Sequence, residues 1–481
     1  MTLKRQTYSA VRWTATATFG RAGLQFIQFA ILARLLTPDD FGLAALAMAM
    51  MALAQIFADM GISNAIIHRR KVSHEELSSL YWLNVMTGIL LTFLFIVLSP
   101  FVASYYAEPR LQPVLAVTSV IFIFNAVGYQ LRVIAEKELR FAPLARLELI
   151  STVLGFTAAV AVALAGGGVY ALVASVVVYS AAACGLSWRW LALGWRPFWR
   201  MRFVEIRGFI GFGAYMIGNN LLNAIKTQAD VLLGGRAFGA GTLGFYVLPR
   251  DLSLRIAGTI NPVVTRVGLP VMSRLQDDRE RLKSVYLQTL RMTASVNFPI
   301  YLALAVFAPE VVSLLFGSRW LESVPVLRIL ALWGLVRSTG NPVGSLLMAV
   351  GKARLSFLWN LGTTAIIVPA LWLGLQYGVQ GLAWALLATQ VVLVIPIWFI
   401  LVRPSSGASF REYQKPLVIP LLVAAGAVAV AHLAALPFEA DYARLPAGLL
   451  AGGGAYFLFS KRFNRAWFAA MRQMIFRTDA H

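Results

Sequence analysis

Long runs of apolar residues recur along the whole chain, separated by short polar connections. They begin near Ala10, end near Phe459 and return every 30 to 40 residues, so that there are about fourteen of them. Each run is about 20 residues long, which is enough for an α-helix to cross the roughly 30 Å hydrocarbon layer of a bilayer. Because lipid offers no hydrogen-bond partner to the backbone, each run that crosses it must be helical. The pattern therefore predicts an all-α polytopic membrane protein with about 14 transmembrane helices.

The order of the runs contains an internal repeat. Residues 34–46, where the first run ends and the second begins, are similar to residues 236–248 at an offset of about 202, with Gly42 matching Gly244. Six runs separate the copies, and because six is even, the two halves share one orientation and should be related by an axis along the membrane normal. We expect a six-helix lobe over residues 1–193, a linker over 194–208, a second, pseudo-symmetric six-helix lobe over 209–402, two additional C-terminal helices over 403–460 and an amphipathic tail over 461–481.

The basic residues are placed asymmetrically. The chain has 42 Lys and Arg against 21 Asp and Glu, a net charge of +21. Most of these cations fall in the N-terminal segment, in every second connection and in the tail, while the other connections hold almost none. This is the positive-inside pattern, and it predicts that the N and C termini are both cytoplasmic. A charge excess explained in this way gives no reason to expect nucleic acid as a partner.

The run over residues 209–234 carries a polar stripe. Asn219, Asn223, Lys226 and Asp230 recur at spacings of four, three and four, which places them on one side of a helix. A charged side chain at the bilayer centre costs roughly 2.5–3.5 kcal/mol on insertion scales, so it usually faces a wet cavity or a partner. The stripe has two possible roles. It either lines a cavity or stabilises the packing of two helices, with Lys226 and Asp230 as an i,i+4 pair. We favour a cavity, because four polar groups exceed what one packing contact needs.

The first run repeats this arrangement. Arg21, Gln25 and Gln28 follow one another at spacings of four and three. Arg21 falls opposite Asn223 at the repeat offset, and it lies too deep to reach either membrane surface easily. We therefore expect Arg21 and Gln25 to line the same cavity.

Two further runs hold charged residues. In residues 243–270 we expect Asp251 and Arg255 to pair at i,i+4, which leaves Arg250 without an obvious local partner. A structural ion pair is the other reading of this group. Arg337 and Asn341 stand at i,i+4 in a later run, just before a proline, with the same two readings open.

Together these positions predict a net-positive interior. The deep cations are Arg21, Lys226, Arg250, Arg255 and Arg337, and the deep anions are Asp59, Asp230 and Asp251, so cations exceed anions by two. Arginine binds phosphate oxygens bidentately, and Asn and Gln suit hydroxyl groups, so the excess favours an anionic, hydroxyl-rich substrate. The candidate substrate-binding residues are Arg21, Gln25, Asn219, Asn223, Lys226, Arg250, Arg255, Arg337 and Asn341, and the ion-coupling candidates are Asp59, Asp230 and Asp251.

The remaining chemistry is sparse. Cys184 is the single cysteine, and the four histidines form no HExxH motif, so we expect no metal site and no cofactor. The connections are short and contain no paired-acid motif, so we predict no catalytic residues and no enzymatic activity. A membrane glycosyltransferase or polymerase would need a catalytic carboxylate or larger loops.

Three segments resemble a known family. Residues 23–43, 57–67 and 138–147 are similar to Wzx-type polysaccharide flippases, the polysaccharide-transporter branch of the multidrug/oligosaccharidyl-lipid/polysaccharide exporter superfamily. The resemblance implies a fourteen-helix, two-lobed flippase in the bacterial inner membrane that moves undecaprenyl-diphosphate-linked oligosaccharides between leaflets by alternating access, without ATP. It also implies membrane lipids, a polysaccharide polymerase and glycosyltransferases as partners. The chain has no P-loop, which agrees.

Two other transport functions stay open within the same superfamily. One is a lipid II flippase for peptidoglycan, which a cationic cavity would suit equally well. The other is a drug/cation antiporter, for which an acidic cavity would be expected. The sequence names neither the glycan nor a coupling ion.

Overall fold

The structure is a computed structural model that describes residues 3–59, 66, 72–199, 201–465 and 467–469 of the 481-residue chain. Within these residues, the side chains of 3–17, 19, 59, 203–217, 219, 263–264 and 266–267 are not described. Wherever regular structure is described it is helical, with no strand among the described residues. The chain divides into two compact units, Met1–Val247 and Leu248–His481.

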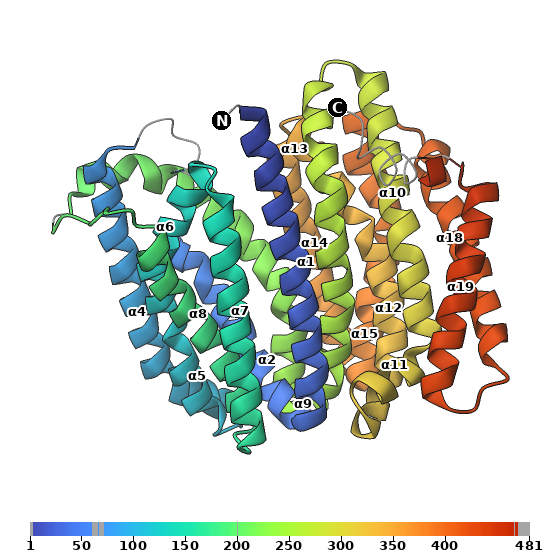
Figure 1. Cartoon of the computed structure of the whole chain (residues 1–481), viewed down its shortest axis with the longest axis horizontal. Helices are drawn as coiled ribbons and strands as arrows, with labels where there is room; N and C mark the ends of the chain where they lie inside the picture. Colours follow the sequence, from blue (N-terminus) through green and yellow to red (C-terminus); the bar gives the residue numbers. More distant parts are fainter. Residues whose placement is uncertain (1–2, 60–65, 67–71, 200, 466, 470–481) are drawn as a thin grey trace. The chain divides into compact units, whose positions relative to one another are not determined.

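The described residues of the first unit form seven helices and the beginning of an eighth. Figure 1 shows how these helices lie side by side. Helix α7 packs against both α1 and α8, and α4 packs against α5 and α6. Ser73 begins α4 with a capping box, and the left-handed residue Ala107 ends it. The helices are α1 (Leu3–Leu35), α2 (Pro38–Asp59), α4 (His74–Tyr106), α5 (Leu111–Ser119), α6 (Ile121–Lys137), α7 (Phe141–Leu164), α8 (Tyr170–Trp190) and the part of α9 (Phe203–Arg274) that ends at Val247.

The second unit contains the rest of α9 and all the later helices. Helix α10 packs against α12 and α18, α18 packs against α19, and α15 packs against α12 and α14. These helices are α10 (Arg279–Val306), α11 (Ala308–Leu315), η1 (Ser318–Ser323), α12 (Val324–Ser338), α13 (Gly340–Ala349), α14 (Ala353–Leu375), α15 (Gly378–Val392), α16 (Val394–Pro396), η2 (Ile397–Val402), α17 (Arg403–Ser406), α18 (Phe410–Ala435) and α19 (Asp441–Phe463).

Within the described ranges, nine helices are long and apolar enough to cross a membrane, or ten if the bent pair α10 and α11 counts as one span. The expectation of an all-helical polytopic membrane protein is therefore confirmed at this level, and the count of about 14 stays a prediction. Two features contribute to the difference between the 14 expected spans and the nine or ten long apolar helices of the described residues: short helices, and one helix long enough for two spans. Helices α12 and α13 hold 15 and 10 residues, each shorter than a full span. A third stretch, Asn220–Pro262, is counted once although its 43 residues are about 65 Å of helix, roughly two bilayer crossings.

A single residue interrupts that long stretch. Gly239 has φ 74° and ψ 175°, so α9 consists of two helices that meet without a loop. A glycine is needed there because a side chain would clash at this φ. The two apolar runs expected over residues 209–234 and 243–270 thus follow each other almost directly, and only Gly239 interrupts the helix between them.

The repeat-related glycines lie against one another's helix. A Cβ atom built on Gly42 would lie 1.8 Å from the carbonyl oxygen of Ala240, and one built on Gly244 would lie 1.8 Å from the carbonyl oxygen of Pro38. The contact is reciprocal, because residues 38 and 42 occupy the positions that 240 and 244 occupy in the second copy. Small residues at such crossings allow two helix backbones to approach closely. The positions matched in the sequence repeat therefore meet in the structure.

The segment after α8, in the expected linker over residues 194–208, packs onto the start of α4. The indole N–H of Trp82 donates to the carbonyl oxygen of Phe198 at 2.8 Å, and the Trp82 and Trp199 rings lie 4.7 Å apart. Trp199 itself is 91% exposed. Exposed Trp side chains beside basic residues are typical of the membrane–water interface. The linker assignment and the other domain boundaries remain predictions, and the expected tail is described only as far as residue 469.

The glycine contact yields a stability prediction. Gly244→Ala places a methyl group on the Pro38 backbone, and overpacking of this kind costs about 1–3 kcal/mol or more. We expect a lower thermal unfolding midpoint for the purified protein in detergent. The matched control is Gly258→Ala on the same helix, where a Cβ meets no atom within 4 Å. The close-approach argument would be refuted by equal midpoints for the two variants.

Candidate functional site

The polar row of α1 faces α8. The Arg21 guanidinium carbon lies 5.5 Å from the centroid of the Tyr179 ring, and the amide of Gln28 donates to the Ser175 hydroxyl at 2.6 Å. Arg21 and Gln25 are both half-buried. A cation over an aromatic face gains about 0.5–2 kcal/mol, depending on how far it is desolvated. Arg21 thus has a protein neighbour that stabilises its charge without neutralising it.

Burial increases along the polar stripe of α9. Asn223 is exposed, Lys226 is half-buried and Asp230 is 3% exposed. The Asp230 carboxylate accepts a hydrogen bond from the Tyr246 hydroxyl at 2.8 Å and another from the backbone N–H of Val231 at 2.9 Å. Tyr246 lies beyond the break at Gly239, so Asp230 ties the two helices of α9 together. The side chain of Asn219 lies outside the described residues, as does that of Asp59 on α2.

The charged group on the second part of α9 differs from expectation. The Arg250 guanidinium contacts the neighbouring Asp251 carboxylate at 3.5 Å, and Arg250 is only 6% exposed. The expectation that Arg250 lacks a local partner is therefore wrong. Burial is the physical reason: a desolvated guanidinium without a counter-charge is too costly, whereas Asp251 is close enough to offset part of that cost. Arg255 is half-buried.

The last pair of candidates lies near the junction of α12 and α13. The Arg337 guanidinium carbon lies 4.9 Å from the centroid of the Trp333 ring, one turn earlier on α12. Asn341 is exposed on α13. Arg337 therefore resembles Arg21 in lying over an aromatic ring.

Sequence reasoning missed a buried polar network in the second unit. The Tyr301 hydroxyl donates to the carbonyl oxygen of Ser253 at 2.6 Å and accepts from the backbone N–H of Ala257 at 3.1 Å. These two groups stand four residues apart on α9, so the hydroxyl inserts into the helix's own hydrogen-bond ladder. Gly334 makes room for the ring, because a Cβ there would lie 2.4 Å from it. No periodicity marks Tyr301, since its partners are backbone atoms of a distant helix.

A second part of that network joins three helices. The amide of Asn297 on α10 donates to the side-chain oxygen of Asn261 on α9 at 2.9 Å, and Asn261 donates to the carbonyl oxygen of Ser338 on α12 at 3.2 Å. Both asparagines are at most 1% exposed. Buried amides of this kind stabilise helix packing in membranes by hydrogen bonding between helices. Their fully buried positions indicate a structural role.

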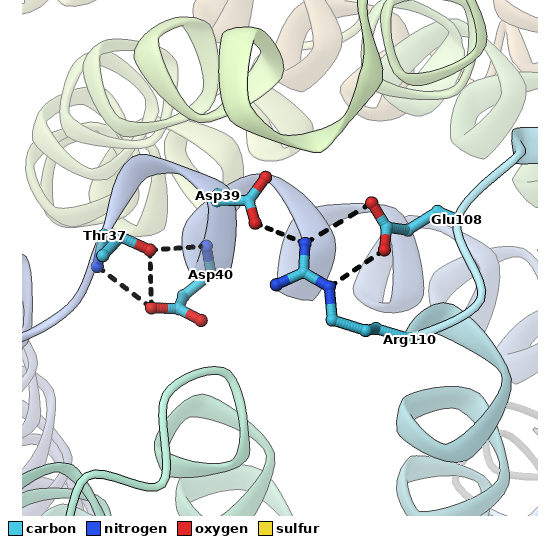
Figure 2. A network of polar contacts seen from close by, with 5 residues as sticks. All are labelled: Thr37, Asp39, Asp40, Glu108 and Arg110. Atoms are coloured by element: carbon cyan, nitrogen blue, oxygen red, sulfur yellow. Dashed lines mark hydrogen bonds and ion pairs between the residues drawn. The ribbon is translucent and has the colours of Figure 1, made fainter.

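A polar network links two turns of the first unit (Figure 2). The Arg110 guanidinium contacts both Asp39, at the start of α2, and Glu108, in the turn after α4. Because the Arg110 guanidinium donates hydrogen bonds to the Glu108 and Asp39 carboxylates, its pKa is raised above its ordinary value. In the α1–α2 turn, the Asp40 carboxylate accepts from the Thr37 hydroxyl at 2.7 Å. Asp39 and Arg110 stand far apart in the sequence and lie in exposed turns, so no run or spacing predicts their contact.

An apolar cavity of about 350 Å³ lies between α10–α11 and α18–α19 in the second unit. Ile300, Leu304, Val428 and Leu449 are among the side chains that line it. None of the described residues that line it is charged. Separately, no group of three or more His, Cys, Asp or Glu side chains in the described part of the chain is placed to hold a metal ion.

The helices and their intramembrane polar residues define a multi-pass membrane protein of the transporter type. The chain belongs to the family described as Polysaccharide biosynthesis protein, which matches residues 31–325. It is 32% identical to the lipopolysaccharide biosynthesis protein WzxC of Escherichia coli over 90% of this chain and 88% of that protein. It is 30% identical to the teichuronic acid biosynthesis protein TuaB of Bacillus subtilis over 87% of each. The structure is similar to the lipid II flippase MurJ in an inward closed conformation, with a TM-score of 0.77, 14% identity, and 95% of this chain and 99% of that chain covered.

The resemblance to Wzx-type flippases expected from the sequence is thus confirmed. The MurJ comparison shows a shared fold, since the identity is too low to carry function. The assignment of individual site residues remains a prediction, because none of these comparisons places a substrate on them.

The Asp230–Tyr246 contact yields a second prediction. A hydrogen bond to a charged group contributes about 1.5–3 kcal/mol, so Tyr246→Phe and Asp230→Asn should each lower the free energy of unfolding. In a double-mutant cycle we expect a coupling energy of about 0.5–3 kcal/mol. The control is a second cycle that combines Asp230→Asn with Tyr442→Phe. Tyr442 is 76% exposed. Additive effects in both cycles would show that the contact contributes nothing to stability.

Proposed function

We propose that the chain is a flippase that moves an undecaprenyl-diphosphate-linked oligosaccharide across the bacterial inner membrane for surface polysaccharide export. The observation that carries this proposal is the 32% identity to WzxC over nine-tenths of the chain. The charge of the deep residues supports it, because a diphosphate is anionic and five cations stand against three carboxylates within the runs. An antiporter for cationic drugs would favour the opposite balance.

The finer architecture belongs to the same proposal. It comprises about fourteen spans, two six-helix lobes with two extra helices, and cytoplasmic termini. Transport proceeds by alternating access through a cationic cavity, without chemical change of the cargo. Its partners are the lipid-linked substrate, membrane lipids, and the polymerase and glycosyltransferases of the pathway.

We assign the proposed substrate contacts by chemistry. Arg21 lies over the Tyr179 ring, and this contact leaves its guanidinium N–H donors available to phosphate oxygens. Arg337, which lies over Trp333, is a second proposed phosphate contact. Lys226, Arg250 and Arg255 are the other proposed phosphate contacts. Gln25, Asn219, Asn223 and Asn341 are assigned to sugar hydroxyls.

Two further elements of the proposal concern the lipid tail and energy. The apolar cavity beside α18 and α19 has the chemistry to hold part of a polyisoprenoid chain. For coupling to an ion gradient, Asp59, Asp230 and Asp251 remain the proposed candidates. Asp230 and Asp251 both have hydrogen-bonded or charged neighbours, so protonation of either would remove an interaction.

The function is tested first by deletion. In the host organism, loss of the gene should make the lipid-linked saccharide accumulate on the inner leaflet, as measured by accessibility of the sugar to an impermeant probe. Continued export at the normal rate would contradict the proposal. Complementation of a strain depleted of its lipid II flippase tests the alternative, and rescue of growth would favour peptidoglycan as the pathway.

The cationic path is tested by charge removal. Arg21→Gln keeps hydrogen-bonding capacity but removes the charge, and the loss of one charge-assisted contact should reduce export roughly tenfold or more at equal expression. The control is Arg354→Gln, an exposed arginine in the first turn of α14. If Arg21→Gln, Lys226→Gln and Arg250→Gln all retained full export, the cationic path would be disproved.

A further inference from the structure

A second cavity of about 290 Å³ lies between α10 and α18 in the second unit, and charged and apolar side chains both line it. Its lining is distinct from every residue assigned above to the transport path. The residues that line the cavity include Arg291, Glu412, Lys415 and Trp467. It lies near the start of α18, on helices that begin in the basic connections expected to be cytoplasmic.

Two cations line the cavity, and among the described residues no acidic side chain neutralises either of them. Neither Arg291 nor Lys415 forms an ion pair with an acidic side chain of the described residues. The acidic residue at the rim, Glu412, is already engaged: it accepts from the backbone N–H of Ser409 at 2.8 Å and contacts Lys283 at 3.3 Å. The local charge inside the cavity is therefore positive, which favours an anionic ligand.

The cavity also has a hydrogen-bond donor without an acceptor. The indole nitrogen of Trp467 is buried and has no hydrogen-bond partner among the described residues. The Trp467 ring packs on Tyr456 at 5.7 Å, which holds it over the cavity. A buried donor left unpaired costs about 1–3 kcal/mol, so an acceptor from a ligand would recover that energy.

The exposed side chains of α18 indicate the level at which the cavity lies relative to the membrane surface. Arg411, Lys415, Val418 and Leu422 follow one another at spacings of four, three and four, so they form one stripe, and all four are exposed. The stripe changes from cationic to apolar between Lys415 and Val418. Such a change marks the boundary between lipid headgroups and acyl chains, because only apolar side chains are favourable against hydrocarbon. Lys415, on the cavity wall, therefore lies at the level of lipid phosphates.

We propose that this cavity binds the phosphate of an anionic phospholipid from the cytoplasmic leaflet, with Arg291 and Lys415 contacting its oxygens and Trp467 donating the third hydrogen bond. The lipid's acyl chains would continue along Val418 and Leu422. Basic pockets between helices on the cytoplasmic side have the chemistry for such headgroups. The site is separate from substrate translocation, so it rests on the membrane orientation proposed above but not on the identity of the transported substrate.

The test is lipid binding by the full-length protein. The purified wild-type chain in neutral detergent is titrated with phosphatidylglycerol, and bound lipid is measured by native mass spectrometry. Arg291→Gln with Lys415→Gln should weaken binding at least roughly tenfold, as expected for two lost charge-assisted contacts. Trp467→Phe keeps the ring and removes only the indole donor, so it should weaken binding roughly two- to tenfold.

The control has the same charge change outside the cavity. Lys461→Gln with Arg465→Gln removes two exposed cations from the same end of the chain and should leave binding unchanged. Equal loss in both double variants would overturn the site and indicate general surface attraction. The thermal midpoint of each variant without lipid shows whether it is folded, and the Trp467→Phe result stands on its own if the Arg291 and Lys415 variant is not.

Three further ligands separate the sources of phosphate. Phosphatidylcholine, which has no net charge, should bind more weakly than phosphatidylglycerol, and equal binding would overturn the electrostatic argument. Inorganic phosphate that competes fully with phosphatidylglycerol at equal concentration would show a free-anion site. Undecaprenyl diphosphate that binds the cavity while phosphatidylglycerol does not would assign it to substrate and overturn the phospholipid proposal.

Discussion

A charge inside a bilayer cannot rely on water, and this constraint explains how the polar residues of the chain are arranged. Arg21 lies over Tyr179, Arg250 contacts Asp251, and the Asp230 carboxylate accepts from Tyr246. In each case a neighbouring side chain reduces the cost of burial. The helices must then be held in the positions that bring these partners together. The burial of charged side chains in this fold therefore depends on how the helices pack.

Close backbone approach solves part of that problem. Lipid tails are as apolar as leucine, so helices in membranes gain little from hydrophobic burial and depend on packing and hydrogen bonds. The reciprocal contact of Gly42 and Gly244 brings two helix backbones into direct contact in the first unit. The turns nearby are linked by Arg110 with Asp39 and Glu108 (Figure 2). Both the small residues and the ionic network act at the beginning of α2, so this helix is held there by backbone packing and by an ion pair.

The sequence predicts some of this arrangement well and some of it not at all. Apolar runs predict helices well, because the hydrocarbon layer requires the same length and apolar composition of every helix that crosses it. The match of Gly42 to Gly244 also predicts a shared role for these two residues. The insertion of Tyr301 between Ser253 and Ala257 is invisible, since its partners are backbone atoms. The prediction that Arg250 lacks a local partner was wrong, because spacing favours i,i+4 neighbours and ignores a contact between adjacent side chains. The number of membrane crossings is harder to determine where a helix is interrupted, as it is between α12 and α13.

The kind of partner that a buried cation has also decides what it can do in transport. A flippase must release its substrate, so a cation on the path has to exchange a protein partner for a phosphate at small net cost. An aromatic ring contributes about 0.5–2 kcal/mol and leaves the N–H donors of arginine available. A carboxylate competes for those same donors, and breaking a buried ion pair leaves a charge uncompensated at a cost of about 3–5 kcal/mol. Arg21 is thus better suited to transient contact than Arg250, whose carboxylate neighbour Asp251 competes with a phosphate for the same donors.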